Sequence, residues 1–420
     1  MAVSVYRSTA VLLAVWLVAA SLAPAISVAQ KPAVGETAAG VPELSVYLIT
    51  MGPGQAVWER YGHNALWIQD NRTGVGRAYN YGIFSFRQEN FFVRFVQGRP
   101  LYWMQGFEVE PHLAAYVAAD RSIWIQELNL TPQQRAALRD FLEWNERPEN
   151  RFYQYDPYRD NCSTRIRDAI DHVLGGRLQQ LTDSEATGGT YRSHSLRLLT
   201  EALPAYLGLL TALGQPADRP LTRWEEMFVP LELQRHLRDV TVLGADGLEA
   251  PLVLSERTAF ESSMSYGSDK PHSWTLGFLA IGLILAALIA LPALRARPAS
   301  GAPLSALIAP SVWALFAGLV GLTLAFLWAL TNHWIAYWNE NLFFFNPLAL
   351  PLAVTLPLLA RRTWWAERVS LGLAGALAAL SVLGLVVQVL PWFFQANGEV
   401  IAFALPPNLA LAWVAFRHGR

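Results

Sequence analysis

Residues 155–171, YDPYRDNCSTRIRDAID, predict a loop that turns into a helix at a cysteine. Pro157 and the Asp and Asn residues that follow it are typical of the end of a loop. The Ile and Ala residues that follow recur at helical spacing. Cys162 is therefore expected in the first helical turn, where free backbone N–H groups lower the pKa of a thiol and stabilise an oxyanion.

Cys162 is the single cysteine in 420 residues. In an oxidising compartment a structural cysteine normally has a disulfide partner, and this one has none. It is therefore either an inert packing residue or a working thiol. Arg165 and Arg167 lie nearby on the expected helix and would add positive potential, which favours the thiolate.

The candidate base is His63, in the segment 59–68, ERYGHNALWI. Alternating apolar and polar residues predict a strand that starts at His63, a turn at 70–74, and a return strand. This hairpin would bring Asn80 or Tyr81 close to His63, and Asn80 could orient the imidazole as the third member of a Cys-His-Asn arrangement. Taken alone, His63 fits a structural role as well as a catalytic one.

Glu59 and Arg60 stand just before His63. They could place a substrate headgroup, or they could form an exposed ion pair. No Cys/His cluster has metal-ligand spacing and no glycine pattern resembles a phosphate loop, so neither a metal nor another cofactor is expected.

Composition divides the chain into a soluble part and a membrane part. Hydrophobic residues make up 53% of the chain and charged residues 15%, and the apolar excess lies at the two ends. The net charge of −1 gives no basic face for a nucleic acid. An apolar run followed by Ser-Val-Ala indicates a secretory signal peptide, with a first membrane anchor as the alternative. The expected parts are a signal peptide at 1–29, a linker at 30–41, a periplasmic catalytic domain at 42–254, a linker at 255–273 and a transmembrane domain at 274–420.

Five apolar stretches in the last part are each close to membrane-spanning length. They lie at about 274–294, 306–330, 345–360, 370–391 and 400–416. Arginines follow the first, third and fifth stretches, so the positive-inside rule places the soluble domain outside the cytoplasm. This predicts a multi-pass protein of the bacterial inner membrane with its catalytic domain in the periplasm.

Two loops on the outer side, 331–344 and 392–399, are rich in aromatic residues. They could be an aromatic belt that anchors helix ends at headgroup depth. Alternatively, they line a lipid-facing mouth beneath the soluble domain, with Trp334 and Trp338 in contact with substrate.

Several of these segments resemble one family, the Lnb-type lipoprotein N-acyltransferases. The matching segments are YLITMGPG at 47–54, ERYGHNA at 59–65, YNYG at 79–82, NCSTR at 161–165, NENL at 339–342 and NPL at 346–348. The resemblance covers about residues 42–350. It implies an α+β, circularly permuted papain-like domain, in which His precedes Cys as in lecithin retinol acyltransferase and NlpC-type hydrolases, followed by an all-α membrane domain of about five helices.

The resemblance also implies an activity. Cys162 would take a fatty acyl chain from a phospholipid as a thioester and pass it to the N-terminal amine of a lipoprotein, with His63 as base. Glu59, Arg60, Arg165, Trp334 and Trp338 are the candidate substrate-binding residues. Two alternatives stay open, an NlpC-type amidase or peptidase that acts on peptidoglycan and a non-enzymatic membrane assembly protein. The sequence sets no oligomeric state.

Overall fold

The computed structural model describes residues 42–420 except 245–246, 271, 296–302 and 419–420. The expected signal peptide at 1–29 and linker at 30–41 lie outside the described residues. From Pro42 onward the chain forms one compact unit, in which an α+β part precedes a set of long apolar helices.

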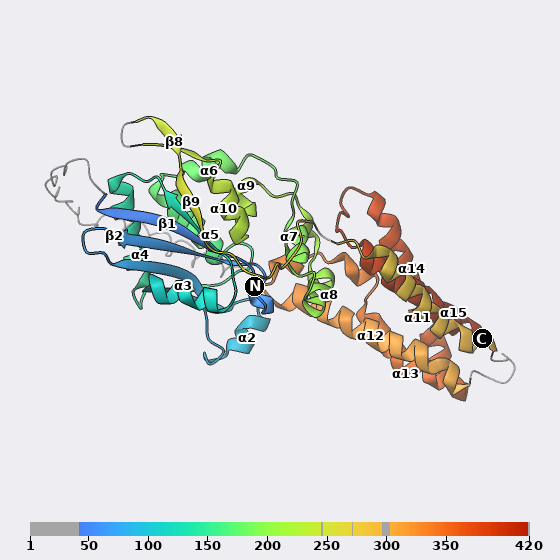
Figure 1. Cartoon of the computed structure of the whole chain (residues 1–420). Helices are drawn as coiled ribbons and strands as arrows, with labels where there is room; N and C mark the ends of the chain where they lie inside the picture. The colour runs from blue at the N-terminus through green and yellow to red at the C-terminus, as the bar shows by residue number, and fades with distance from the viewer. Residues whose placement is uncertain (1–41, 245–246, 271, 296–302, 419–420) are drawn as a thin grey trace, which may run out of the picture. The chain divides into compact units, whose positions relative to one another are not determined.

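The α+β part is built on an antiparallel sheet of seven strands (Figure 1). The strand order is β6-β4-β3-β2-β1-β5-β9. Their bounds are β1 Leu44–Met51, β2 His63–Asp70, β3 Gly76–Ile83, β4 Leu101–Glu108, β5 Ile123–Leu128, β6 Phe152–Gln154 and β9 Val253–Phe260. The expected hairpin is present, because β2 pairs with β3 in antiparallel register, with Leu66 opposite Tyr79.

The central strand β1 explains the layers of this part. Alternate side chains of a strand point to opposite faces of the sheet. Val46 and Leu48 pack with α4, α5 and α10 on one face, whereas Ile49 and Met51 pack with α3 on the other. The helices are α3 Val109–Ala118, α4 Pro132–Glu146, α5 Cys162–Val173 and α10 Pro230–Leu237. Because both faces are covered, β1 is apolar almost throughout.

The domain boundary expected at residue 254 is wrong. Residues Val253–Phe260 form the edge strand β9, which pairs with β5 along its length. Its side chains are mostly exposed, so the segment lacks the apolar pattern by which a strand is recognised. Pairing of its backbone with β5 holds it in the sheet instead.

Residues 176–251, which carry no motif, form short helices and a small hairpin. These are α6 Arg177–Thr182, α7 Tyr191–Leu198, α8 Leu203–Ala212, α9 Arg223–Glu226, β7 Thr241–Leu243 and β8 Glu249–Pro251, with α10 between α9 and β7. Asn64, Asn161 and Ser163 all donate side-chain hydrogen bonds to backbone carbonyls of the α9–α10 connection, at 3.5, 2.9 and 2.6 Å. This region therefore supports the N-terminal end of α5.

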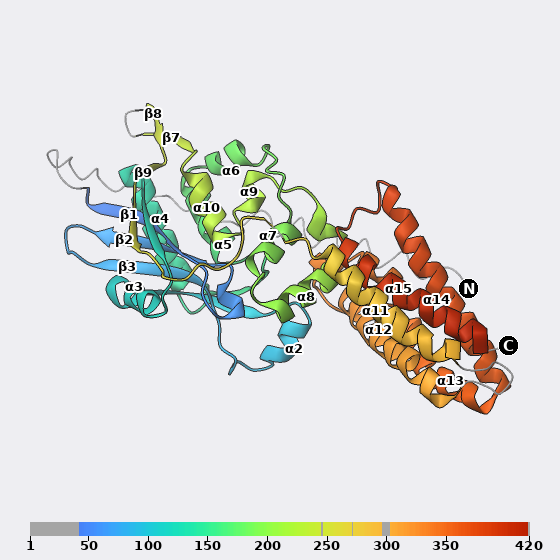
Figure 2. The same cartoon turned by 45° about the vertical axis from the view of Figure 1, so that its right-hand side comes forward.

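Five segments of the described chain are long and apolar enough to cross a membrane, as expected. They are α11 Thr275–Arg295, α12 Leu304–Leu330, a third segment Glu340–Arg361, a fourth segment Trp364–Val389 that begins with α14 Trp364–Val386, and α15 Gly398–His418. The third is irregular, since 3-10 turns precede its regular helix, α13 Leu350–Leu358. Figures 1 and 2 show the helices running side by side. Gly282 lets α11 approach α15 closely, because a Cβ there would lie 2.6 Å from the carbonyl oxygen of Ala402.

Candidate active site at the start of the Cys162 helix

Helix α5 begins at Cys162, where the sequence predicts it. The Asn161 side-chain oxygen accepts hydrogen bonds from the N–H groups of Ser163 and Thr164, at 2.8 and 2.9 Å, and caps the helix. Thr164 completes the capping box by accepting from the Asn161 N–H at 2.8 Å. The cap fixes the first turn, and Cys162 stands half-buried within it.

His63 and Asn80 form the contact expected from the hairpin. The Nε2 atom of His63 lies 3.1 Å from the Oδ1 atom of Asn80. The Asn80 Nδ2 atom donates to the carbonyl of Ala78 at 3.1 Å, so Oδ1 must be the atom that faces the imidazole. Nε2 then carries the proton and Nδ1 is the basic nitrogen. The Tyr81 hydroxyl instead donates to Asn145 at 2.6 Å, which leaves the orienting position to Asn80.

The structure corrects the expected ionisation of the thiol. Burial raises the pKa of Cys162 to about 11, although the backbone N–H groups of Asn64, Ser163 and Cys162 favour the thiolate. The pKa of His63 is lowered to about 3, mainly by burial and next by the positive charge of Arg121. The hydrogen bond to Asn80 raises this pKa but does not offset the two. The pair therefore rests as neutral thiol and neutral imidazole at neutral pH, and the helix N-terminus does not outweigh desolvation.

Arg121 is a site residue that sequence reasoning missed. It is buried, and its charge acts on both His63 and Cys162. Its Nε atom donates to the carbonyl of Gly52 at 2.9 Å, and Nη1 lies 3.6 Å from a Glu59 carboxylate oxygen. Among the described residues its buried Nη2 has no hydrogen-bond partner. A buried cation with an unpaired donor near a thiol can stabilise a developing negative charge. No motif surrounds Arg121, so only the fold reveals it.

Glu59 and Arg60 do not pair with each other. Glu59 holds Arg121, whereas Arg60 is buried, lies 3.6 Å from Glu201 and covers the Tyr266 ring at 4.1 Å. The expectation of an exposed ion pair is wrong because the two side chains leave the chain in different directions. Glu59 therefore contributes to the site by its contact with Arg121. Arg60 instead links the residues before β2 to Glu201 and Tyr266.

Arg165 and Arg167 do not supply the positive charge expected at the thiol. Arg165 forms an ion pair with Asp160 and lies 4.2 Å from the centre of the Tyr153 ring. Arg167 is held by Asp168 and by the carbonyl of Trp224. Both charges have local partners, and the cation that acts on Cys162 is Arg121.

Gly82 lies against Cys162 and Tyr155. It has φ of +92°, a backbone conformation that favours glycine. A Cβ at this position would lie 3.6 Å from Cys162 Cβ and 4.0 Å from the Tyr155 ring. Tyr155 and Cys162 therefore both border the position that a Gly82 side chain would occupy.

The two tryptophans of the loop 331–344 have different surroundings. The Trp334 indole N–H donates to Asp156 at 2.6 Å, and the Arg159 guanidinium lies 3.3 Å from the centre of its ring. Trp334 thus clamps the turn that leads into Cys162. Trp338 is 63% exposed and packs on Trp328 of α12. Of the two tryptophans, Trp334 contacts the α+β part and Trp338 is exposed.

The membrane helices meet the α+β part through a cluster of buried polar residues, here called the outer joint, which consists of Asn339, Glu340, Asn341 and Gln395. Glu340 accepts hydrogen bonds from Gln215 at 2.7 Å, Gln388 at 2.6 Å and the Gln395 N–H at 3.1 Å. Asn339 and Asn341 donate to the carbonyl of Thr211 in α8, at 3.0 and 2.9 Å. Each side-chain oxygen and nitrogen of the joint has a partner, so the joint is a structural seam.

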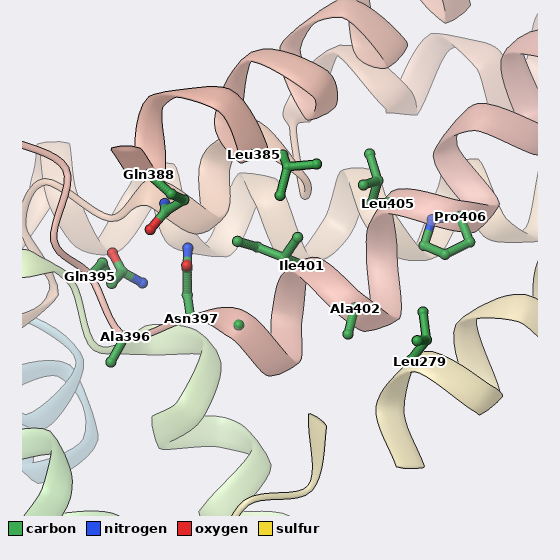
Figure 3. A pocket seen from close by; sticks show the side chains of 11 residues that line it. Leu279, Leu385, Gln388, Gln395, Ala396, Asn397, Ile401, Ala402, Leu405 and Pro406 are labelled. Atoms are coloured by element: carbon green, nitrogen blue, oxygen red, sulfur yellow. The ribbon is translucent and has the colours of Figure 1, made fainter. Parts of the chain in front are cut away.

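A cavity of about 570 Å³ opens among α11, the fourth apolar segment and α15 (Figure 3). Gln388, Gln395 and Asn397 gather at one end, and Leu279, Leu405 and Pro406 lie toward the other. The volume is in the range of small-molecule sites. An apolar chain with a hydrogen-bonding end would match this lining, which shares no residue with the Cys162 site.

Among the described residues, one group has possible metal-ligand atoms close enough together to share an ion. It consists of Glu226, Glu232 and His236. Arg235 contacts both carboxylates and Arg197 lies 2.8 Å from Glu232, so the negative charge is already matched. Glu226 also bonds to His236 at 2.6 Å. The group is therefore a buried ion network beside the α9–α10 connection.

Two family models match the chain. The Lnb N-terminal periplasmic domain matches residues 33–202, and the Lnb transmembrane domain matches residues 278–396. The first match contains His63, Asn80, Arg121 and Cys162, and the second contains the loop of Trp334 and the whole outer joint. No curated protein and no solved structure matches the chain.

Proposed function

Because the chain belongs to the Lnb family, as a multi-pass inner-membrane protein with a periplasmic domain, we propose that it is a thiol acyltransferase. It takes a fatty acyl chain from a phospholipid, holds it as a thioester on Cys162, and passes it to an amine, the N-terminus of a lipoprotein. The observation that carries the proposal is the joint placement of Cys162 at a helix start, His63 oriented by Asn80, and Arg121 with an unused donor.

In the first half-reaction, Nδ1 of His63 takes the Cys162 proton as the sulfur attacks an ester carbonyl of the phospholipid. The carbonyl oxygen becomes an oxyanion, stabilised by backbone N–H groups at the start of α5 and by Arg121. The bond from carbonyl carbon to glycerol oxygen then breaks. His63 returns the proton to that oxygen, so a lysophospholipid leaves and the acyl group stays on sulfur.

In the second half-reaction, an acceptor amine attacks the thioester carbonyl while His63 takes its proton. The carbon–sulfur bond breaks, the sulfur regains a proton from His63, and the product is an amide. Neutral resting states of Cys162 and His63 fit this scheme, since the proton moves only when substrate occupies the site. Enclosure also keeps water from the thioester.

The membrane part supports transfer between lipids over hydrolysis of cell wall. Both substrates of the proposed reaction reside in the bilayer, and Trp334 links the outer loop directly to the turn before Cys162. A peptidoglycan amidase would require an anchor but no such link.

The test uses purified full-length protein in vesicles with a labelled phospholipid and a diacylglyceryl-modified lipopeptide. We expect an N-acylated lipopeptide and an equal amount of lysophospholipid by mass spectrometry, with neither formed by Cys162→Ala. Cleavage of muropeptides without lysophospholipid would replace this proposal with the hydrolase.

A further inference from the structure

The surface around helix α2, Phe91–Val96, exposes an unusual number of large apolar side chains. Phe92, Val93 and Phe95 are 69%, 54% and 51% exposed, and Trp58 and Phe86 beside them are 65% and 55% exposed. We name these five residues, with Val96, the α2 patch. Contiguous apolar surface of this kind marks a protein or membrane interaction site.

Hydrogen bonds tie the α2 patch to the outer end of a membrane span. Helix α12 ends at Leu330, and the N–H of Asn332 donates to the carbonyl of Gln97 at 2.8 Å. The imidazole of His333 lies 3.1 Å from the carbonyl oxygen of Phe95. Gly98 allows this approach, because a Cβ there would lie 2.9 Å from the backbone of Asn332 and His333. The α2 patch is thus held beside the end of α12.

The charge around the α2 patch fits phospholipid headgroups. The stretch 84–99, which contains α2, has three arginines, Arg87, Arg94 and Arg99. Glu89 is the only acidic residue in this stretch. Aromatic side chains mixed with arginine are typical of segments that lie in the membrane interface. This composition, together with the link to α12, selects the lipid surface as the partner.

A continuous series of aromatic rings leads from the α2 patch to the thiol. Successive ring centres are 5.1 Å apart from Phe86 to Phe84, 5.0 Å from Phe84 to Tyr102, and 4.2 Å from Tyr102 to Tyr155. Phe84, Tyr102 and Tyr155 are half-buried, so each residue keeps part of its surface accessible. Tyr155 ends the series and, like Cys162, borders the position that a Gly82 side chain would occupy. We name Phe84, Tyr102 and Tyr155 the aromatic strip.

We propose that the α2 patch inserts into the outer leaflet and that the aromatic strip binds the acyl chain of the phospholipid donor on its way to Cys162. The second half of this inference rests on the proposed acyl transfer, whereas the insertion does not. Alkyl chains lie favourably on aromatic surface, and a chain placed on the strip would bring its ester carbonyl to the sulfur.

Insertion is tested with single-cysteine proteins, which the chain offers because Cys162 is its only cysteine. In full-length Cys162→Ala protein, Phe92→Cys is labelled with an environment-sensitive fluorophore. Val75→Cys is the control, since Val75 is 65% exposed in the turn at the far end of β2 from His63. In phosphatidylglycerol-containing vesicles, nitroxide lipids should quench the label at position 92 and spare that at position 75. Equal, negligible quenching at both positions would overturn the insertion.

Chain binding is tested by the ratio of Cys162 acylation from dipalmitoyl to that from dihexanoyl phosphatidylcholine. Phe84→Ser and Tyr102→Ser should lower this ratio at least tenfold, and Val75→Ser should leave it at the wild-type value. An unchanged ratio in both strip variants would overturn this role. If wild-type protein is acylated by neither lipid, the acyltransferase proposal fails while the quenching result still decides insertion.

A second measurement avoids loss of folding in the strip variants. Full-length Cys162→Ala protein is irradiated with a phospholipid that carries a diazirine in its acyl chain. Crosslinks to peptides with Phe84 or Tyr102 support the aromatic strip, and crosslinks that avoid both peptides contradict it.

Discussion

The Cys162 site and the outer joint are both built from buried polar side chains, but they differ in how those side chains are used. In the joint, Glu340 and Gln395 have hydrogen-bond partners for all their side-chain oxygens and nitrogens. At the site, Arg121 Nη2 and Asn64 Oδ1 have none among the described residues. Native proteins leave few buried polar groups unpaired. The joint is thus fully paired and the Cys162 site is not, although single unpaired atoms also occur elsewhere in the described chain, such as Asn397 Oδ1 and Arg60 Nε.

The largest loss of activity is expected when a reacting group of the Cys162 site is replaced. Cys162→Ala should abolish acyl transfer, and His63→Ala should lower its rate by about 10²–10⁴, the usual contribution of general acid–base catalysis. Both variants should keep the wild-type Tm, which separates lost chemistry from lost folding. Activity of His63→Ala within about tenfold of wild type, roughly 1.4 kcal/mol of barrier, would remove His63 as the base.

Arg121→Met tests the spare donor at the site. Losing one oxyanion donor typically lowers the rate by about 10²–10³. The variant should also raise the pKa of the Cys162 thiol further, because the guanidinium favours the thiolate. Alkylation of Cys162 by iodoacetamide as a function of pH measures that shift, which a merely structural role would not produce. The matched control is Arg139→Met, which removes a surface pair with Asp140.

Glu340→Ala tests the opposite region. Three donors would lose their acceptor, so we expect a loss of stability on the order of 3 kcal/mol and a clearly lower Tm in detergent. Glu149→Ala removes an exposed carboxylate and should leave the Tm unchanged. A normal Tm for Glu340→Ala would mean that the hydrogen bonds of the joint do not stabilise the fold. The proposed difference between the joint and the Cys162 site would then be wrong.

Asn80→Ala should have a smaller effect, a fall in rate of roughly tenfold, since one neutral hydrogen bond contributes about 0.5–1.5 kcal/mol. Tyr81→Phe is the control, because its hydroxyl bonds to Asn145 and not to His63. If the two variants exchanged effects, the orienting role would pass to Tyr81.

The pH dependence should be the weakest effect of all. With a pKa of about 11 for Cys162 and about 3 for His63, neither group changes ionisation between pH 5 and 9. The rate of the acylation half-reaction should therefore be flat over this range. A bell-shaped profile centred near pH 7 would show a preformed thiolate–imidazolium pair instead.

The sequence predicted those parts that depend on local pattern. Apolar run length predicted five spans, the end of the loop before Cys162 predicted the start of α5, and the hairpin pattern predicted that Asn80 or Tyr81 lies near His63. It failed where long-range contacts decide. Nothing in the sequence near Arg121 shows that its charge acts on Cys162. The sequence analysis expects Arg165 near the thiol, because the ion pair between Arg165 and Asp160 is seen only in the folded structure. β9 was missed because an exposed edge strand is held by its backbone pairing rather than by apolar side chains.

If Cys162 carries the acyl group from the phospholipid to the acceptor, a thioester forms on its sulfur and can be detected. Full-length protein is incubated with phospholipid that has a labelled acyl chain, without acceptor, and digested for mass spectrometry. We predict the acyl mass on the peptide that contains Cys162, its release by neutral hydroxylamine, and no label on Cys162→Ala. Lysophospholipid formed while Cys162 stays unmodified, or label that survives hydroxylamine, would contradict the account.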